Sequence, residues 1–433
     1  MGEIAEISFV SVLFVGLLVS GMWIPLAVCV TASVYLYMVG GWSSFRAFGL
    51  ISWGSMNNFT LTAIPLFIFM ADLMLESGLS NRVYRGLSRL VSRLPGGLLQ
   101  TNVAGCAIFS AISGSSVATA AAIGTVALPQ LKERGYDPRL ATGTLAAGGT
   151  LGILIPPSIA LIVYGTFSET SITQLFMAGL LPGLTLTALF MGYVAIRALI
   201  NPTVAPVEVG SQDHIAWTQV ATDLLPFALL IFAVMGSLYA GIVTPTEAAA
   251  VGVVFSAIIC FIWGDLSWTV FNNALKKTVR VTGAILFIVY SAFIFSYAIG
   301  MSGLPDILTE YLVELDLSYA GFLIALLILF TLMGCLVDSL GMMVITVPLL
   351  LPLLGVYGID PLWFGVALVL LIELGQISPP LGLNLFVIHN ISRGKLGDVI
   401  LGSFPFFFLI YLCLGLLVLF PQLALWLPAT MTR

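Results

Sequence analysis

Charge is scarce in this chain of 433 residues. Asp, Glu, Lys and Arg together make up 8% of it, whereas 60% of the residues are hydrophobic. A soluble globular protein needs far more charged surface than this, so the composition excludes that class. With a mean hydropathy of +1.11, the sequence predicts an all-α polytopic membrane protein that forms one membrane domain, residues 1–433, in contact with the lipid bilayer.

Metal-binding residues are also few. The two histidines, His214 and His389, are far apart in the sequence, and the five cysteines lie in apolar stretches without metal-ligand spacing. We therefore expect no metal centre, no disulfide and no cofactor other than a coupling ion, and no nucleic-acid partner. The cysteines are Cys29, Cys106, Cys260, Cys335 and Cys413.

Apolar windows of about 20 residues, the length of a membrane-crossing helix, predict ten crossings. They cover residues 4–20, 22–40, 59–78, 140–165, 172–196, 217–241, 245–264, 281–300, 362–390 and 399–420.

Residues 97–130 hold no charged side chain and yet fit no simple crossing. One helix of this length would reach roughly 50 Å, whereas a bilayer core is about 30 Å thick. Ser113, Gly114, Ser115 and Ser116 interrupt the apolar run and leave arms of 16 and 14 residues. We expect a re-entrant hairpin whose tip lies inside the membrane. Two short tilted crossings are the alternative.

Two basic segments, residues 81–94 and 266–280, are predicted to be amphipathic helices at the lipid headgroups that need no partner beyond anionic lipid. The positive-inside rule then places thirteen of the 15 basic residues in the cytoplasm, with Arg46 and Arg433 opposite. The acidic loop, residues 306–316, and both termini are expected outside. The thirteen are Arg82, Arg85, Arg89, Arg93, Lys132, Arg134, Arg139, Arg197, Lys276, Lys277, Arg280, Arg393 and Lys395.

An internal repeat with a constant offset of 223 residues relates the two halves of the chain. Six matches occur in register, more than chance explains in a proline-rich chain. They pair Ser115-Ser116 with Asp338-Ser339, Pro129 with Pro352, Gly135 with Gly358, Asp137-Pro138 with Asp360-Pro361, Gly152 with Gly375, and Pro156-Pro157 with Pro379-Pro380.

The repeat defines the expected organisation of the chain. An odd number of crossings, five, separates equivalent spans, so the halves are predicted to be inverted in the membrane. The first repeat covers 59–165, with a hairpin at 97–130 and a broken helix at 140–165. The second covers 281–390, with a hairpin at 319–357 and a broken helix at 362–390. Residues 1–58, 166–280 and 391–433 form mainly scaffold and connecting helices.

Both predicted broken helices combine glycines with a pair of prolines, at residues 147–157 and 373–380. Proline removes an amide donor and glycine lets the chain unwind, which frees backbone carbonyls. Inverted repeats built on discontinuous helices are typical of secondary transporters. Free carbonyls with nearby hydroxyls suit a hard cation such as Na⁺. A Pro-kinked helix satisfied by its neighbours is the alternative.

Intramembrane carboxylates are functional candidates because an unpaired charge there is costly. Asp338, at the second hairpin tip, is favoured for an ion or substrate site over a structural hydrogen bond. Glu373 has two open roles, an ion ligand or a cap for a broken helix end. Glu247 is expected to order the start of its span.

The candidate ion- or substrate-binding residues are Ser113, Gly114, Ser115, Ser116, Thr119, Gly148, Gly149, Thr150, Gly152, Pro156, Asp338, Ser339, Glu373, Gly375, Ser378 and Pro379. The Na⁺ candidates among them are Ser113, Ser116, Gly149, Asp338, Gly375 and Ser378. None of the hairpin tips or broken segments contains Arg or Lys. An anionic substrate would therefore depend on hydroxyls, amides, helix N-termini and coupling cations.

Four motifs carry a family resemblance: SGSSVATA at 113–120, GGTLGILIPPS at 148–158, TPTEAAA at 244–250 and ELGQISPPLGLN at 373–384. Together they resemble the large membrane subunit of tripartite ATP-independent periplasmic (TRAP) transporters, in its unfused form, over nearly the whole chain. Ser378 departs from the Thr that is usual in the family, although the hydroxyl is kept.

The resemblance implies an elevator-type fold and Na⁺-coupled uptake of an organic anion of the carboxylate, sialic acid or dicarboxylate class. It also implies a small four-helix membrane subunit, a periplasmic binding protein, and the cytoplasmic membrane of a bacterium or archaeon, with both termini periplasmic. A stand-alone Na⁺ or H⁺ symporter for dicarboxylates is the alternative. An intramembrane hydrolase that uses Asp338 and Glu373 as an acid pair is less favoured, because it would not explain an inverted repeat.

Overall fold

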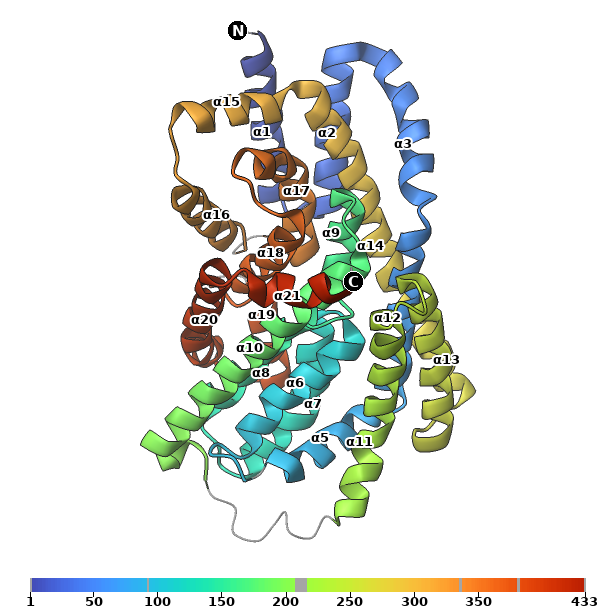
Figure 1. Ribbon diagram of the computed structural model, residues 1–433, viewed down its shortest axis with the longest axis vertical. Coiled ribbons are helices and arrows are strands. Elements are labelled where there is room, and N and C mark those ends of the chain that lie inside the picture. The colour runs from blue at the N-terminus through green and yellow to red at the C-terminus, as the bar shows by residue number, and fades with distance from the viewer. Residues whose placement is uncertain (1, 92, 207–215, 335–336, 380–381, 432–433) are drawn as a thin grey trace.

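A computed structural model describes residues 2–91, 93–206, 216–334, 337–379 and 382–431. Every regular element within these residues is helical (Figure 1). Eight of the helices are long and apolar enough to cross a membrane. The fold class expected from composition, an all-helical polytopic membrane protein, is confirmed. Four residues used in the sequence analysis lie outside the described ranges: His214, Cys335, Pro380 and Arg433.

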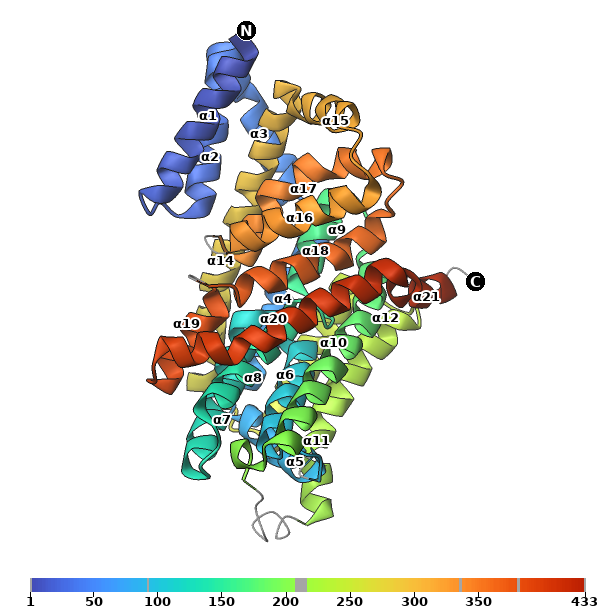
Figure 2. The ribbon, with the colours of Figure 1, turned by 90° about the vertical axis from the view of Figure 1, so that its left-hand side faces the viewer.

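The N-terminal part leads from one end of the molecule to the basic segment at the other. In both views α5 lies at the end of the long axis opposite to the N-terminus (Figures 1 and 2). The helix over 46–56 lies outside the ten predicted crossings. The elements are α1 (Gly2–Val19), α2 (Ile24–Gly40), η1 (Gly41–Phe45), α3 (Arg46–Met56), η2 (Phe59–Thr62), α4 (Ala63–Glu76) and α5 (Leu79–Val91).

The first hairpin and the first broken helix follow. Gly114 ends α6 in the left-handed conformation, with φ 60°, which glycine adopts without steric penalty. Ser115 begins α7 as its N-cap, since its hydroxyl accepts a hydrogen bond of 3.4 Å from the N–H of Ala118. The predicted interruption of this helix at residues 113–116 is confirmed. The elements are α6 (Leu98–Ser113), α7 (Ser116–Glu133), α8 (Pro138–Thr150), η3 (Leu151–Ile153) and α9 (Ile159–Ser168).

The middle of the chain supplies connecting helices. Glu247 takes part in a capping box: its carboxylate accepts the N–H of Thr244 at 2.8 Å, and the Thr244 hydroxyl accepts the N–H of Glu247 at 3.4 Å. The expected role of Glu247 at a helix start is confirmed. The elements are α10 (Ile172–Ile200), η4 (Pro202–Val204), α11 (Trp217–Ile231), the π-helical η5 (Phe232–Gly236), α12 (Ser237–Tyr239) and α13 (Pro245–Trp263).

The second basic segment is not a separate helix. Residues 268–302 form one continuous helix of 35 residues, α14 (Trp268–Ser302). The predicted division of this stretch into an interfacial helix, 266–280, and a crossing, 281–300, is wrong. The stretch contains no proline, so no residue interrupts the ladder of backbone hydrogen bonds.

The second hairpin and the second broken helix lie between α15 and α20. The acidic stretch expected to be a loop, residues 306–316, is helical as far as Glu314, because it forms most of α15. Figure 1 shows α15 near the N-terminus and far from α5. The elements are α15 (Leu304–Glu314), α16 (Tyr319–Gly334), α17 (Ser339–Val356), α18 (Pro361–Gln376), α19 (Leu383–Ser392), α20 (Leu396–Leu419) and α21 (Gln422–Met431).

The offset of 223 residues seen in the sequence also relates local structure. The helices α7 and α17 both have 18 residues and begin at equivalent positions. Asp137 caps α8 by accepting the N–H of Leu140 at 2.8 Å, and its equivalent, Asp360, caps α18 by accepting the N–H of Leu362 at 2.7 Å. Equivalent side chains therefore perform the same capping task in each half.

The two interrupted helices run antiparallel to each other. The Asn384 side chain, at the start of α19, donates a hydrogen bond of 3.2 Å to the carbonyl of Ala146 in α8. At the other end, Tyr164 of α9 donates one of 2.6 Å to the carbonyl of Pro361, where α18 begins. A residue late in each interrupted helix therefore lies beside a residue early in the other. The helix α19 also packs on α7, so elements of both halves meet at one place.

Candidate functional site

The tip of the first hairpin lies against the first interrupted helix. A Cβ atom added to Gly152 would lie 2.5 Å from the carbonyl oxygen of Ser115 and 2.8 Å from Oγ1 of Thr119. Only glycine permits so close an approach. The hydroxyls of Ser113 and Thr119 are 2.6 Å apart, and both side chains are buried. The structure therefore brings together four of the predicted site residues.

The second hairpin repeats this arrangement with different side chains. Gly375 is equivalent to Gly152, and its Cα lies against the backbone of Gly334, at the end of α16. A Cβ atom added to Gly375 would lie 3.0 Å from Cε of Met342, which is equivalent to Thr119. The second tip therefore packs as tightly as the first but presents a thioether where the first presents a hydroxyl.

The middle of the site lies where the two interrupted helices cross. A Cβ atom added to Gly149 would lie 3.2 Å from Nδ2 of Asn384. The Thr150 side chain lies beside the carboxylate of Glu373, although its hydroxyl donates to the carbonyl of Ala147 at 2.8 Å. Gly149, Thr150 and Glu373 were all predicted as site residues, and the fold brings them together from opposite halves.

Buried polar atoms without partners gather at this crossing. Within the described part of the chain, five polar atoms here have no hydrogen-bond partner. They are both carboxylate oxygens of Glu373, both polar atoms of the Gln376 amide and Oδ1 of Asn384. These side chains are 0%, 2% and 0% exposed, respectively. Buried polar groups in proteins nearly always have a partner. Carboxylate and amide oxygens are suitable ligands for a hard cation or acceptors for a polar substrate group.

Gln376 and Asn384 are not among the site residues that the sequence predicted. Both lie in the motif 373–384, and both are amides in a broken apolar helix. Polar side chains within such an apolar segment could have identified both as candidate site residues. Only the antiparallel packing of α19 on α8 reveals which way Asn384 points.

Not all predicted residues gather at the crossing. Asp338 is partly buried and caps α17 by accepting the N–H of Gly341 at 3.4 Å. A Cβ atom added to Gly341 would lie 3.2 Å from Cδ1 of Ile24, so the start of α17 faces α2. Pro379 is exposed, whereas Ser378 is buried.

The remaining predicted residues lie in the first hairpin, the first interrupted helix and the start of α17. Ser116 and Pro156 are buried, and Ser339 is partly buried beside Asp338. A Cβ atom added to Gly148 would lie 3.1 Å from the side chain of Cys106, so Gly148 serves the packing of α8 on α6. Gly114 accepts the N–H of Ile159 at 3.3 Å through its carbonyl, which links the first tip to the start of α9.

The basic segments make specific ion pairs, contrary to the expectation that lipid would suffice for them. Arg85 of α5 forms two hydrogen bonds of 2.7 Å with the carboxylate of Asp223 in α11. Lys277 of α14 lies 3.1 Å from Asp72 and 3.6 Å from Glu76, both in α4. These pairs form because the fold places acidic residues from distant segments beside the cations.

Comparison with known proteins agrees with these features. The family described as the tripartite ATP-independent periplasmic transporter, DctM component, matches residues 10–423. The chain is 33% identical to the C4-dicarboxylate TRAP transporter large permease protein DctM of Pseudomonas aeruginosa, over 89% of this chain and 90% of that protein. It is 31% identical to the ectoine TRAP transporter large permease protein TeaC of Halomonas elongata, over 95% and 96% of the two chains.

Solved structures show a similar fold in other transporters. The YdaH transporter of Alcanivorax borkumensis superimposes with a TM-score of 0.66 at 17% identity, over 96% of this chain and 99% of that one. MtrF of Neisseria gonorrhoeae, from a class of antimetabolite efflux pumps, gives a TM-score of 0.60 at 14% identity, over 95% and 97% of the two chains.

The relatives are named as permease proteins, which argues against the hydrolase alternative. The chain belongs to the DctM family, the large permease component of tripartite ATP-independent periplasmic transporters, and is a membrane transport component rather than an enzyme.

Proposed function

We propose that this chain couples Na⁺ entry to the uptake of a small organic anion of the carboxylate, sialic acid or dicarboxylate class. The cluster of buried, unpartnered polar atoms on Glu373, Gln376 and Asn384 carries the proposal. Asn384 lies beside Gly149 and Glu373 beside Thr150, where helices from opposite halves cross, and Gln376 lies one turn further along α18 than Glu373. Discontinuous helices with oxygen ligands at the crossing are the arrangement that secondary transporters use for coupling ions.

The sequence around the crossing favours a bound coupling cation that stabilises the anionic substrate. Residues 113–119, 147–158, 334–342 and 373–384 include no Arg or Lys. A bound anion would therefore rely on amides, hydroxyls and the coupling cations for its stabilisation. The Na⁺ ligands we propose are Ser113, Ser116, Gly149, Asp338, Gly375 and Ser378, together with the newly found Asn384.

Alternating access in this proposal is an elevator movement. The hairpins and interrupted helices, α6 to α9 and α16 to α19, would move as one unit against the scaffold helices. Their mutual packing supports this: α19 packs on both α7 and α8, and α18 packs on α9. The proposed inversion of the two repeats accords with the antiparallel course of the interrupted helices.

We further propose that the chain resides in the cytoplasmic membrane of a bacterium or archaeon, with both termini in the periplasm. The basic α5 lies at the end of the molecule opposite to the N-terminus (Figures 1 and 2), so the positive-inside rule, applied to α5, supports a periplasmic N-terminus. Its proposed partners are a small four-helix membrane subunit and a periplasmic binding protein that delivers the anion.

The test is uptake by liposomes that contain this chain, the small subunit and the binding protein. C4-dicarboxylate and sialic acid, the substrates in the names of two relatives, are the first anions to assay. An inward Na⁺ gradient should drive accumulation, and replacement of Na⁺ by K⁺ should abolish it. Equal uptake driven by a proton gradient without Na⁺ would refute the proposed coupling ion.

A further inference from the structure

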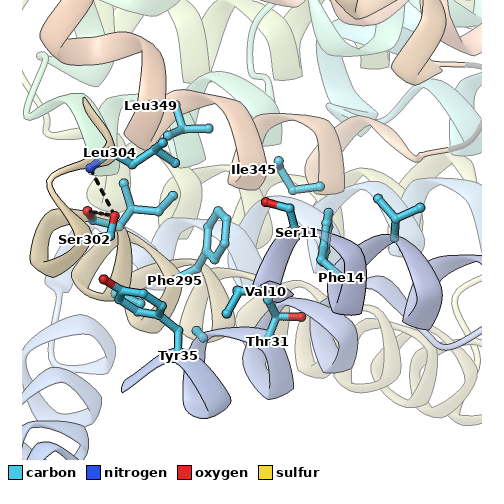
Figure 3. A pocket seen from close by; sticks show the side chains of 14 residues that line it. Val10, Ser11, Phe14, Thr31, Tyr35, Phe295, Ser302, Leu304, Ile345 and Leu349 are labelled. Carbon is cyan, nitrogen blue, oxygen red and sulfur yellow. Dashed lines mark hydrogen bonds between the residues drawn. The ribbon is translucent and has the colours of Figure 1, made fainter. Parts of the chain in front are cut away.

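A largely apolar cavity lies between the N-terminal helices and the second hairpin. Its volume is about 230 Å³, and its walls come from α1, α2, α14, α15 and α17 (Figure 3). Phe14, Ala32, Phe295 and Ile345 line it from four of these helices. An apolar cavity of roughly 150 Å³ already binds benzene in preference to water, so this one is large enough for a hydrocarbon ligand.

One side of the cavity is continuous with the apolar outer surface of α1. Val15 lines the cavity and is 56% exposed. Val12 and Val19 extend the exposed apolar face of the same helix. In a membrane protein such a face contacts lipid. A chain from the bilayer can therefore enter the cavity without passing through water.

The cavity also contains a polar atom without a partner. Thr31 lines it and is 1% exposed, and within the described residues its Oγ1 forms no hydrogen bond. A helical hydroxyl usually donates to the carbonyl four residues earlier, as Ser33 does to Cys29 at 2.6 Å. Thr31 does not, so its hydroxyl is available to a ligand that carries an acceptor oxygen.

We propose that one acyl chain of a membrane phospholipid occupies this cavity and that the Thr31 hydroxyl donates a hydrogen bond to its ester carbonyl. The lining is largely apolar, the entrance faces lipid, and the buried hydroxyl of Thr31, which has no partner among the described residues, matches the ester oxygen of the same molecule. The occupant touches α2 and α14 on one side and α17 on the other. It thereby bridges the N-terminal helices and the helix that begins at Asp338.

Photo-crosslinking from lipid nanodiscs tests this site. The full chain would be reconstituted in phosphatidylglycerol nanodiscs that contain a trace of phosphatidylglycerol with a diazirine on one acyl chain. We expect adducts on buried lining residues, such as Ala298, in addition to those on lipid-exposed faces. Substitution Ala32→Phe fills the cavity and should lower the buried adducts about tenfold, because acyl binding scales with the methylenes buried.

The matched control is Val30→Phe, which places the same phenyl side chain on α2 at an exposed position that does not line the cavity and should leave the adducts unchanged. Leu349→Trp fills the cavity from α17 and replaces Ala32→Phe if that variant does not fold. Adducts confined to exposed faces, or equal adducts in the filling variant and the control, would overturn the proposal.

The ester contact has its own test. Thr31→Val keeps the cavity but removes the donor, so it should lower adducts from the ester-linked probe several-fold. An ether-linked diazirine lipid has no such carbonyl and should label Thr31→Val and the parent chain equally. If Thr31→Val lowers the adducts from both probes equally, the proposed hydrogen bond is contradicted, although the acyl site is not. None of these readouts depends on transport.

Discussion

The phenolic oxygen of Tyr164 donates a hydrogen bond of 2.6 Å to the carbonyl oxygen of Pro361. This bond fixes the end of the first interrupted helix beside the start of the second. Asn384, late in the second interrupted helix, donates a hydrogen bond of 3.2 Å to the carbonyl of Ala146, early in the first. Because these contacts reverse the order of the two segments, the starts of α8 and α18 point to opposite sides of the molecule.

This geometry predicts the sidedness of two equivalent aspartates. Cysteine at Asp137, before α8, should react with an impermeant thiol reagent from the cytoplasmic face, and cysteine at Asp360, before α18, from the outer face. The variants are matched, because each removes the N-cap of an equivalent helix. Replacement of Cys29 by Ser removes the only partly exposed native thiol among the described residues. Labelling of both positions from the same face would contradict the inversion.

The ion pair between α5 and α11 predicts an asymmetric stability effect. The Asp223 side chain is 1% exposed, whereas that of Arg85 is 44% exposed. Arg85→Met leaves a buried carboxylate unpaired and should lower the free energy of unfolding by about 1–3 kcal/mol. Asp223→Asn leaves a cation that reaches water, so its effect should be smaller. Chemical denaturation in detergent measures both, with Arg82→Met on the same helix as control; equal effects would contradict the argument.

The amide of Asn384 is predicted to be required for transport. Asn384→Ala removes a buried oxygen at the crossing and should reduce the initial uptake rate roughly tenfold, since one lost ligand or hydrogen bond costs about 1–3 kcal/mol. Asn390→Ala, at an exposed position of the same helix, is the control and should transport normally. A rise in the Na⁺ concentration for half-maximal uptake would identify an ion ligand. Normal rate and normal Na⁺ dependence in Asn384→Ala would exclude the role.

The chain alone is predicted to transport poorly. Its candidate site lacks basic side chains, so affinity for a free anion should be weak, and a binding protein that docks outside would raise the local anion concentration. Uptake should be compared for the purified chain, for the chain with the small subunit, and for both with the loaded binding protein. Saturable transport at the full rate by the lone chain would favour the stand-alone symporter.

The sequence alone predicted the features that depend on neighbouring residues. The interruption at residues 113–116 and the helix-start role of Glu247 both follow from side chains that bond to backbone within three residues. The repeat offset was also visible in the sequence, because equivalent caps and turns reuse the same residue types. Interactions between residues this close in the sequence can be predicted without knowledge of the fold.

Only the tertiary structure decided the contacts between distant segments. It paired Lys277 with Asp72 and Arg85 with Asp223, and it turned Asn384 toward Ala146. In a chain that is apolar almost throughout, hydrophobic periodicity does not distinguish buried faces from lipid-facing ones. The packing of one helix on another is therefore set by close backbone approach, as at Gly152 and Gly375, and by the few polar side chains that must find partners away from water.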